Sequence, residues 1–188
     1  MKKLMLVAAG VLLAGRVFAA DTYKIDNAHS NIGFSIKHMM VSKTTGQFGK
    51  FDGTIAYSPD DLAGSKVSVT IPVDSINTAN EARDKHLKNP DFFDMEKFPE
   101  ITFVSKSITK DTITGDLTIK GVTKEIAIPV TIEGPIKGMQ GKEIIGINGA
   151  TTINRQDYGI TYGAVLDQGG LALGNDVDVN FSIEASKE

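Results

Sequence analysis

Histidine is the first residue type to consider for chemistry, because the chain has three histidines and no cysteine. Three imidazoles converging on one point would make a zinc site. His29 and His38 are nine positions apart, so a regular strand that carried both would point them to opposite faces. His86 lies in a separate segment with helical spacing. The spacing therefore predicts no metal site.

Charged residues around His86 are the second candidate for chemistry. Arg83, Asp84 and His86 fall within one helical turn, but no serine or cysteine nucleophile accompanies them. The spacing singles out no pair of carboxylates for acid–base work among Asp91, Asp94, Asp157 and Asp176. The stretch 154–159 is interpreted as a turn with a local ion pair. No catalytic residue is predicted, and the chain is expected not to be an enzyme.

The segment 1–19 has the layout of a secretory signal peptide. Lys2 and Lys3 precede an uncharged apolar run, residues 4–15, and small residues follow before Ala20. The apolar run is too short to span a bilayer, and without cysteine the chain cannot carry a lipid-modified cysteine. The sequence therefore predicts a signal peptide over 1–19 and one exported domain over 20–188, with no stable membrane anchor.

The charge of the exported part excludes one class of partner. Without Lys2, Lys3 and Arg16, the 20 basic residues of the chain fall to 17 against 23 acidic ones, a net charge of −6. No basic cluster remains, so no nucleic-acid partner is expected. An acidic protein is also poorly suited to holding on to anionic lipid surfaces.

Alternation of apolar and polar residues with a period of two predicts eight half-buried strands. Because each run has a polar face, the pattern argues against parallel strands covered by helices on both sides. A sandwich and a barrel both fit eight antiparallel strands, and the length of several runs favours the barrel. The runs are 31–38, 51–57, 66–73, 101–105, 112–119, 126–132, 145–153 and 177–183.

A single short helix interrupts the strands. Thr78 and Glu81 have the spacing of a capping box, and Asn89 followed by Pro90 is expected to end the helix. The predicted fold class is therefore all-β, an eight-stranded antiparallel barrel with one short helix.

The interior of such a barrel is either filled by side chains or able to hold one small ligand. Gly53, Gly115 and Gly149 lie on the apolar face, where they leave space for a ligand or permit the kinks that close a barrel. Under the first interpretation, Gly115→Leu would fill the cavity and weaken binding. The adjacent residues Phe92 and Phe93 either plug one end of the barrel or form a lid over the ligand.

The sequence is compatible with two alternative roles for each of two polar residues, His38 and Arg83. His38 shares the apolar face and is either a hydrogen-bonded core histidine or a contact for a ligand head group. Arg83 either lies on a solvated helix face or turns inward to meet a carboxylate or phosphate.

Motifs along the whole exported chain resemble those of one protein family. They include His29-Ser30, Asp74-Ser75-Ile76-Asn77-Thr78, Arg83-Asp84-Lys85-His86-Leu87, Phe92-Phe93-Asp94, Gly115-Asp116-Leu117-Thr118 and Asn154-Arg155. In this order and at compatible spacing, the motifs are similar to those of the YceI-like family of bacterial polyisoprenoid-binding proteins.

The resemblance implies a lipocalin-like barrel whose elongated apolar pore holds a polyisoprenoid, an isoprenoid quinone or a similar long aliphatic chain. It also implies a periplasmic location, no cofactor other than the bound lipid, and no catalytic residues. The candidate ligand-binding residues are inward positions of the strands together with Arg83 and the two adjacent phenylalanines. They are Phe34, Ile36, His38, Phe51, Ile55, Val69, Ile71, Arg83, Phe92, Phe93, Phe103, Leu117, Ile119, Ile128, Val130, Ile147 and Phe181.

Three functions are compatible with the sequence. The first is a carrier or binding protein for such a lipid. The second is an enzyme acting on a lipid head group, with Arg83, His86 and Asp94 near the entrance. The third is a stress-response protein whose barrel is closed and which acts through its surface. A homodimer formed by an edge or rim contact is compatible with all three, and the sequence does not require it.

Overall fold

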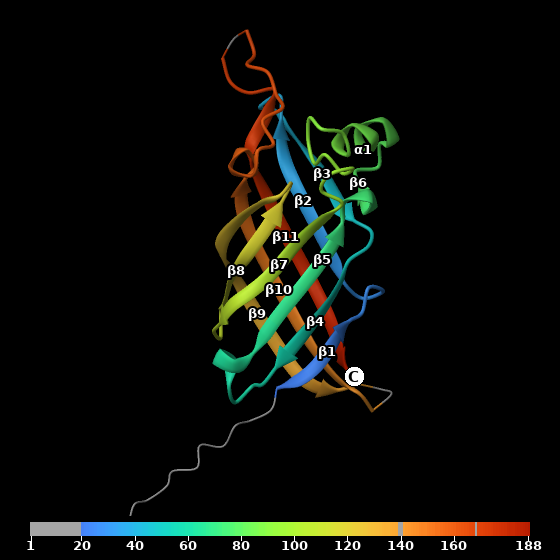
Figure 1. The fold of residues 1–188 in the computed structure, drawn as a ribbon, viewed down its shortest axis with the longest axis vertical. Coiled ribbons are helices and arrows are strands. Elements are labelled where there is room, and N and C mark those ends of the chain that lie inside the picture. The colour runs from blue at the N-terminus through green and yellow to red at the C-terminus, as the bar shows by residue number, and fades with distance from the viewer. Residues whose placement is uncertain (1–19, 139–140, 168) are drawn as a thin grey trace, which may run out of the picture.

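The computed structural model describes residues 20–138, 141–167 and 169–188, which form an elongated β-barrel with a helix beside its upper end (Figure 1). The predicted signal peptide over 1–19 lies outside the described residues. Within the described ranges, no helix combines the length and the apolar character that a membrane span requires.

Eleven strands form one antiparallel sheet in the described part of the chain. The first six are β1 (Asp21–Ile25), β2 (Asn31–His38), β3 (Ser42–Phe48), β4 (Asp52–Tyr57), β5 (Lys66–Pro72) and β6 (Ile76–Asn77). The α-helix α1 (Glu81–Leu87) follows β6. The remaining strands are β7 (Glu100–Ile108), β8 (Thr112–Ile119), β9 (Val122–Lys137), β10 (Glu143–Asn154) and β11 (Leu173–Lys187). Three single turns of 3-10 helix are η1 (Leu62–Gly64), η2 (Val73–Ser75) and η3 (Arg155–Tyr158).

Eight of these strands close the barrel. In the order β1-β4-β5-β7-β8-β9-β10-β11 each strand pairs with the next, and β11 pairs again with β1. The long strand β11 has two partners on its other edge: 173–182 pair with β2, and 185–187 pair with β1. The sheet continues from β2 to β3 and β6, which leads directly into α1. The upper wall therefore carries extra strands and a helix that the lower wall lacks.

The predicted fold class is confirmed, because the structure is an all-β, closed eight-stranded antiparallel barrel with one α-helix in the described residues. All eight predicted runs form strands. Three further strands, β1, β3 and β6, were not predicted, and β1 rather than β2 completes the closed ring. β1 and β6 are short, and β3 is polar except for Gly46 and Phe48, so none has a long apolar alternation.

The start of α1 differs from the predicted capping box. Asn80 is the N-cap, and its side-chain oxygen accepts a hydrogen bond from the backbone N–H of Arg83 at 3.0 Å. Thr78 instead donates both its backbone N–H and its hydroxyl to the carboxylate of Asp84. These bonds tie the helix to the strand β6 that precedes it, and the helix ends at Leu87 before the predicted stop.

Candidate functional site

A cavity of about 740 Å³ occupies the part of the barrel next to α1. Its walls come from β2, β3 and β11 on one side, from β5, β7 and β8 on another, and from α1 and η3 at the end. The lining is chiefly aliphatic and aromatic, with a few polar groups among them. This size and lining are typical of sites for small apolar ligands.

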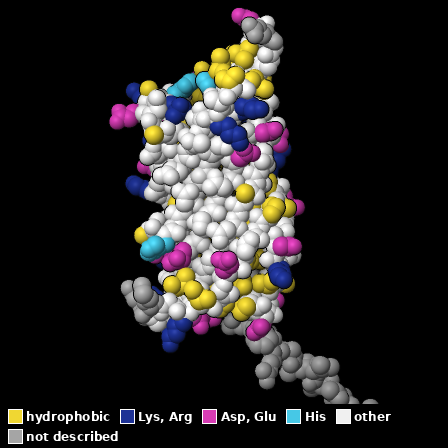
Figure 2. Space-filling view, turned by 180° about the vertical axis from the view of Figure 1, so that it is seen from behind, with side chains coloured by type: hydrophobic (Ala, Val, Ile, Leu, Met, Phe, Trp, Pro, Cys, Tyr) yellow, Lys and Arg dark blue, Asp and Glu magenta, His cyan; other side chains and the backbone are white. Residues whose placement is uncertain are grey.

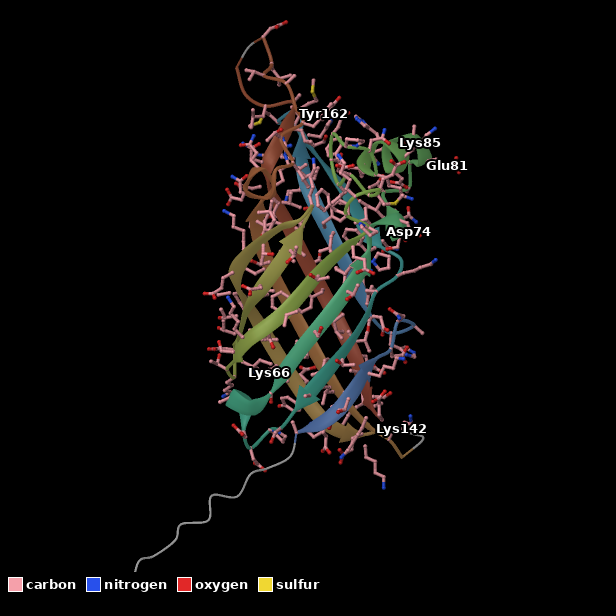
Figure 3. The ribbon with its side chains drawn as sticks, in the orientation of Figure 1. Lys66, Asp74, Glu81, Lys85, Lys142 and Tyr162 are labelled. Atoms are coloured by element: carbon pink, nitrogen blue, oxygen red, sulfur yellow. The ribbon has the colours of Figure 1, made fainter. Side chains whose placement is uncertain are left out.

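The cavity meets solvent at one end, which we call the mouth. His38 and Tyr162 are exposed and also line the cavity, so they mark this opening. Tyr162 lies at the upper end of the barrel beside α1, whereas Lys66 and Lys142 lie at the opposite end (Figure 3).

Nine of the seventeen candidate ligand-binding residues line this cavity. They are Phe34, Ile36, His38, Ile71, Arg83, Phe92, Phe93, Leu117 and Ile119. The structure therefore brings together residues from β2, β5, β8, α1 and the loop after the helix.

The other eight do not line it and belong to the packed core or its margin. Five are buried and three are partly buried against the core: Phe51, Ile55, Ile128, Val130 and Ile147, then Val69, Phe103 and Phe181. Alternation identifies the inward face of a strand, but it does not tell how far along the barrel the interior is filled.

Glycines on the inward face do not open space for a ligand, so that interpretation was wrong. A methyl group at Gly115 would lie 2.6 Å from Cζ of Phe103, and one at Gly149 would lie 2.5 Å from Cζ of Phe181. The phenyl rings of the neighbouring strands occupy the room that these glycines leave. Gly115→Leu would collide with Phe103 and with the carbonyl oxygen of Val104, 2.5 Å away, rather than fill the cavity.

His38 is the last residue of β2 and lies at the mouth. It is exposed, which excludes the interpretation as a core histidine. Thr44, from the neighbouring strand β3, adds a hydroxyl to the same region of the lining. These two side chains give one wall of the mouth a polar edge.

Arg83, from α1, provides a positive charge among the residues that line the cavity. Its Nε donates to the hydroxyl of Thr78 at 2.8 Å, and its Nη2 donates to the carbonyl oxygen of the same residue at 2.8 Å. Among the described residues its guanidinium forms no salt bridge, so Nη1 keeps its donors for another group. The side chain is exposed, as on a solvated helix face, and it also lines the cavity.

An aromatic cluster joins α1 and the loop after it to the segment after η3. The ring centroid of His86 lies 5.0 Å from that of Phe92 and 4.9 Å from that of Tyr162. Lys120 reinforces the connection, because its Nζ donates to the carbonyl oxygen of Pro90 at 2.8 Å and to that of Gly159 at 3.4 Å. The loop after α1 and the segment after η3 are thereby joined over the cavity.

Phe93 lies on the inner side of this closure and packs against Phe48, with ring centroids 6.5 Å apart. The adjacent residues Phe92 and Phe93 both line the cavity from the end near α1.

Arg155 is a cavity-lining residue that the sequence reasoning missed. It is buried, with 5% of its surface exposed, and burial lowers the pKa of its guanidinium. It donates to the carbonyl oxygens of Gly174 at 2.8 Å, Ile160 at 2.8 Å and Tyr162 at 2.6 Å. The predicted turn is present as η3. Arg155 is held by hydrogen bonds to these carbonyl oxygens rather than by the predicted local ion pair. An arginine directly after an apolar strand was the only sequence signal for this role.

His29 lies away from the mouth, in the connection between β1 and β2. Its Nδ1 is 2.9 Å from a carboxylate oxygen of Asp26 and 3.9 Å from one of Glu184. The hydrogen bond to Asp26 raises the pKa of His29, and the same bond lowers the pKa of Asp26. Spacing between histidines could not reveal this group, because Glu184 comes from the distant strand β11.

Comparisons with known proteins agree on one family. The YceI-like domain matches residues 23–185. The UPF0312 protein SAS2572 of Staphylococcus aureus (strain MSSA476) is 45% identical over 165 residues, which cover 87% of this chain and 96% of that protein.

Solved structures share the fold. BcnA of Burkholderia cenocepacia has a TM-score of 0.74 at 25% identity, covering 85% of this chain and 98% of its own. A polyisoprenoid binding domain from Saccharophagus degradans has a TM-score of 0.67 at 16% identity, covering 91% of this chain and all of its own. With a family match over most of its length and relatives at this level of identity, the chain belongs to the YceI-like family.

Proposed function

We propose that this protein is a binding or carrier protein that holds a long aliphatic lipid, of the polyisoprenoid or isoprenoid quinone class, in the cavity beside α1. The observation that carries the proposal is the cavity itself, about 740 Å³ in volume and lined chiefly by apolar side chains. Each methylene group moved from water into such a lining contributes about 0.8 kcal/mol. A long chain without polar groups therefore gains most from this site.

The family supports the class of ligand. The structure from Saccharophagus degradans, which shares the fold, is described as a polyisoprenoid binding domain. The fold similarity alone does not transfer a ligand, but the apolar lining here is independently suited to the same chemistry.

Polar groups at the mouth would orient the lipid. Arg83 and His38 both line the cavity, and the Nη1 donors of Arg83, which have no partner among the described residues, suit a phosphate or carbonyl oxygen. The chain would enter the cavity first, and the head group would stay near these two residues.

Binding explains this mouth better than catalysis. Asp94, one of the three residues considered for an enzyme, does not line the cavity and pairs with Lys97 at 3.2 Å. His86 lies 2.9 Å from a carboxylate oxygen of Asp91 and packs its ring in the aromatic cluster. The three groups therefore do not converge on one reacting position. The cavity also argues against a closed barrel that acts only through its surface.

Export would place this carrier in the periplasm, where it would shield the lipid from water between membranes. This part of the proposal rests on the signal peptide predicted over 1–19 and on the charge pattern that precedes Ala20.

A pair of matched valine variants tests the proposal. Val179 lines the cavity, whereas Val104 is exposed on the outside of β7. Val179→Phe should reduce the uptake of an added polyprenyl alcohol or quinone at least tenfold by filling the cavity, and Val104→Phe should leave uptake unchanged. Equal uptake by folded samples of both variants would show that the lipid does not occupy this cavity.

A further inference from the structure

Exposed apolar side chains gather around the mouth of the cavity. Seven large hydrophobic residues are exposed in the described part of the chain, and five of them lie in two segments beside the mouth. We call these five residues the mouth patch: Met39, Met40, Val41, Tyr162 and Val165. Figure 2 shows a cluster of hydrophobic side chains at this upper end of the barrel.

The two segments of the mouth patch lie against each other. The backbone N–H of Met39 donates to the carbonyl oxygen of Ala172 at 2.8 Å, and Gly170 lies beside the side chain of Met40. Val41 and Val165 are the most exposed members, at 87% and 73%. Tyr162 belongs both to the patch and to the cavity lining, so the apolar surface continues from the outside into the cavity.

The turn that presents the methionines is unusual in its sequence. Met39 and Met40 have φ angles of 51° and 62°, and the carbonyl oxygen of His38 accepts a hydrogen bond from the N–H of Val41. Turns with two consecutive left-handed residues favour Asn-Gly, because other side chains are strained there. Turn chemistry and solubility would both select against two methionines at this position. Their presence points to a role for the exposed side chains.

Basic residues lie next to the apolar tip. Lys37 and Lys43 are opposite each other on the outward face of β2 and β3, just before and just after the turn. Lys43 is paired with Asp178 at 2.8 Å, whereas Lys37 has no salt bridge among the described residues. Figure 2 shows Lys and Arg side chains near the upper hydrophobic cluster. The apolar turn at 39–41, with lysines on the strands beside it, matches the layering of a lipid surface, in which phosphates lie above the acyl chains. The second segment carries an exposed acidic residue, Asp167, beyond Val165.

We propose that the mouth patch docks on the surface of a lipid bilayer, so that lipid moves between membrane and cavity without crossing water. The inference rests on the proposed lipid-binding function and adds the place where the lipid enters. Docking is transient, because only loop tips insert and the exported chain carries a net charge of −6. A bilayer, rather than a second protein, is the partner that offers both phosphates for Lys37 and the cargo for the cavity.

A variant that improves the turn tests the inference without endangering the fold. Met39→Asn combined with Met40→Gly removes both side chains and installs the residues that this turn prefers. A flotation assay measures how strongly residues 20–188 bind to protein-free vesicles of phosphatidylcholine and phosphatidylglycerol. The double variant should bind roughly tenfold more weakly, a factor that corresponds to about 1.4 kcal/mol. Ile136→Ser, which removes an exposed apolar side chain from β9, should bind as the parent does.

The outcomes separate this inference from the proposed function. Occupancy of the cavity, measured by native mass spectrometry on purified protein, should be the same in the double variant and in the parent. Lipid transfer between donor and acceptor vesicles should fall with vesicle binding. Equal vesicle binding by the parent and the double variant would overturn the docking inference while leaving the cavity intact. Binding only to membranes that contain proteins would overturn it in favour of a protein partner. An empty cavity in a parent protein that still binds vesicles would instead contradict the proposed function.

Discussion

The ring centroids of Phe92 and Tyr162 lie 4.8 Å apart at the end of the cavity, although the two residues belong to segments seventy positions apart in the sequence. His86 contacts both rings edge to face. Since Phe92 follows α1 and Tyr162 follows η3, separating these rings would widen the mouth without breaking any strand pairing. The aromatic cluster is therefore the part of the barrel that is best placed to control exchange of a ligand.

Removing one ring should speed ligand release. Tyr162→Ala deletes two aromatic contacts, each of which contributes about 0.5–1.5 kcal/mol, so the release rate of a bound polyprenyl chain should rise roughly tenfold. Tyr162→Phe keeps the ring and should release the chain at the rate of the parent. Stopped-flow displacement with a fluorescent lipid measures both rates. Unchanged release from the alanine variant would show that the ligand leaves by another route.

Arg155 should matter for stability rather than for ligand chemistry. Its guanidinium donates to carbonyl oxygens of 160, 162, 173 and 174, so Arg155→Met leaves one buried and three partly buried acceptors without these donors. Arg155→Met should lower the free energy of unfolding by roughly 3 kcal/mol, and lysine should not rescue it because an ammonium cannot reproduce the planar fork. Urea unfolding monitored by circular dichroism provides the measurement.

Arg83 offers the control for that experiment. It is exposed, so Arg83→Met should change the free energy of unfolding by less than about 0.5 kcal/mol. A loss of stability as large as that of Arg155→Met would contradict the different roles assigned to the two arginines.

The turn at His29 should give a pH-dependent signal. Its hydrogen bond to Asp26 raises the pKa of His29 above the ordinary value of 6.5. The pair therefore favours the folded state below pH 6.5, and this contribution disappears as the pH rises through the raised pKa of the folded state. An NMR titration of the imidazole should show a midpoint above 6.5, and Asp26→Asn should move it toward 6.5. A midpoint that does not respond to Asp26→Asn would show that this hydrogen bond does not determine the pKa.

The fold could be predicted because each half-buried strand carries its own pattern. Val177, Val179, Phe181 and Ile183 alternate with polar residues, and β11 follows this alternation. β3 could not be found this way, because its inward face consists of Thr44, Gly46 and Phe48 and gains its place only by pairing with β2. Short β1 closes the ring through pairing with β4 and β11, which are contacts over long sequence distances.

The site could be predicted only in part. Sequence patterns identify which side chains face inward, but not whether they lie in the open or in the filled part of the barrel. Phe34 and Phe103 have the same apolar alternation, yet Phe34 lines the cavity whereas the ring of Phe103 fills the space beside Gly115. Arg155 was missed because its partners are backbone carbonyl oxygens, of residues 160, 162, 173 and 174, which no side-chain motif encodes. The aromatic cluster likewise depends on Tyr162 meeting residues that precede it by about seventy positions.

Native mass spectrometry of the protein purified from its natural source, followed by organic extraction, would detect a lipid bound in the cavity. If the cavity binds lipid, the spectrum should show the protein with a single lipid of stoichiometric mass, and extraction should yield a long isoprenoid or similar aliphatic chain. A clean mass of the free protein, with no uptake of added polyprenyl or quinone chains, would contradict a lipid-binding cavity.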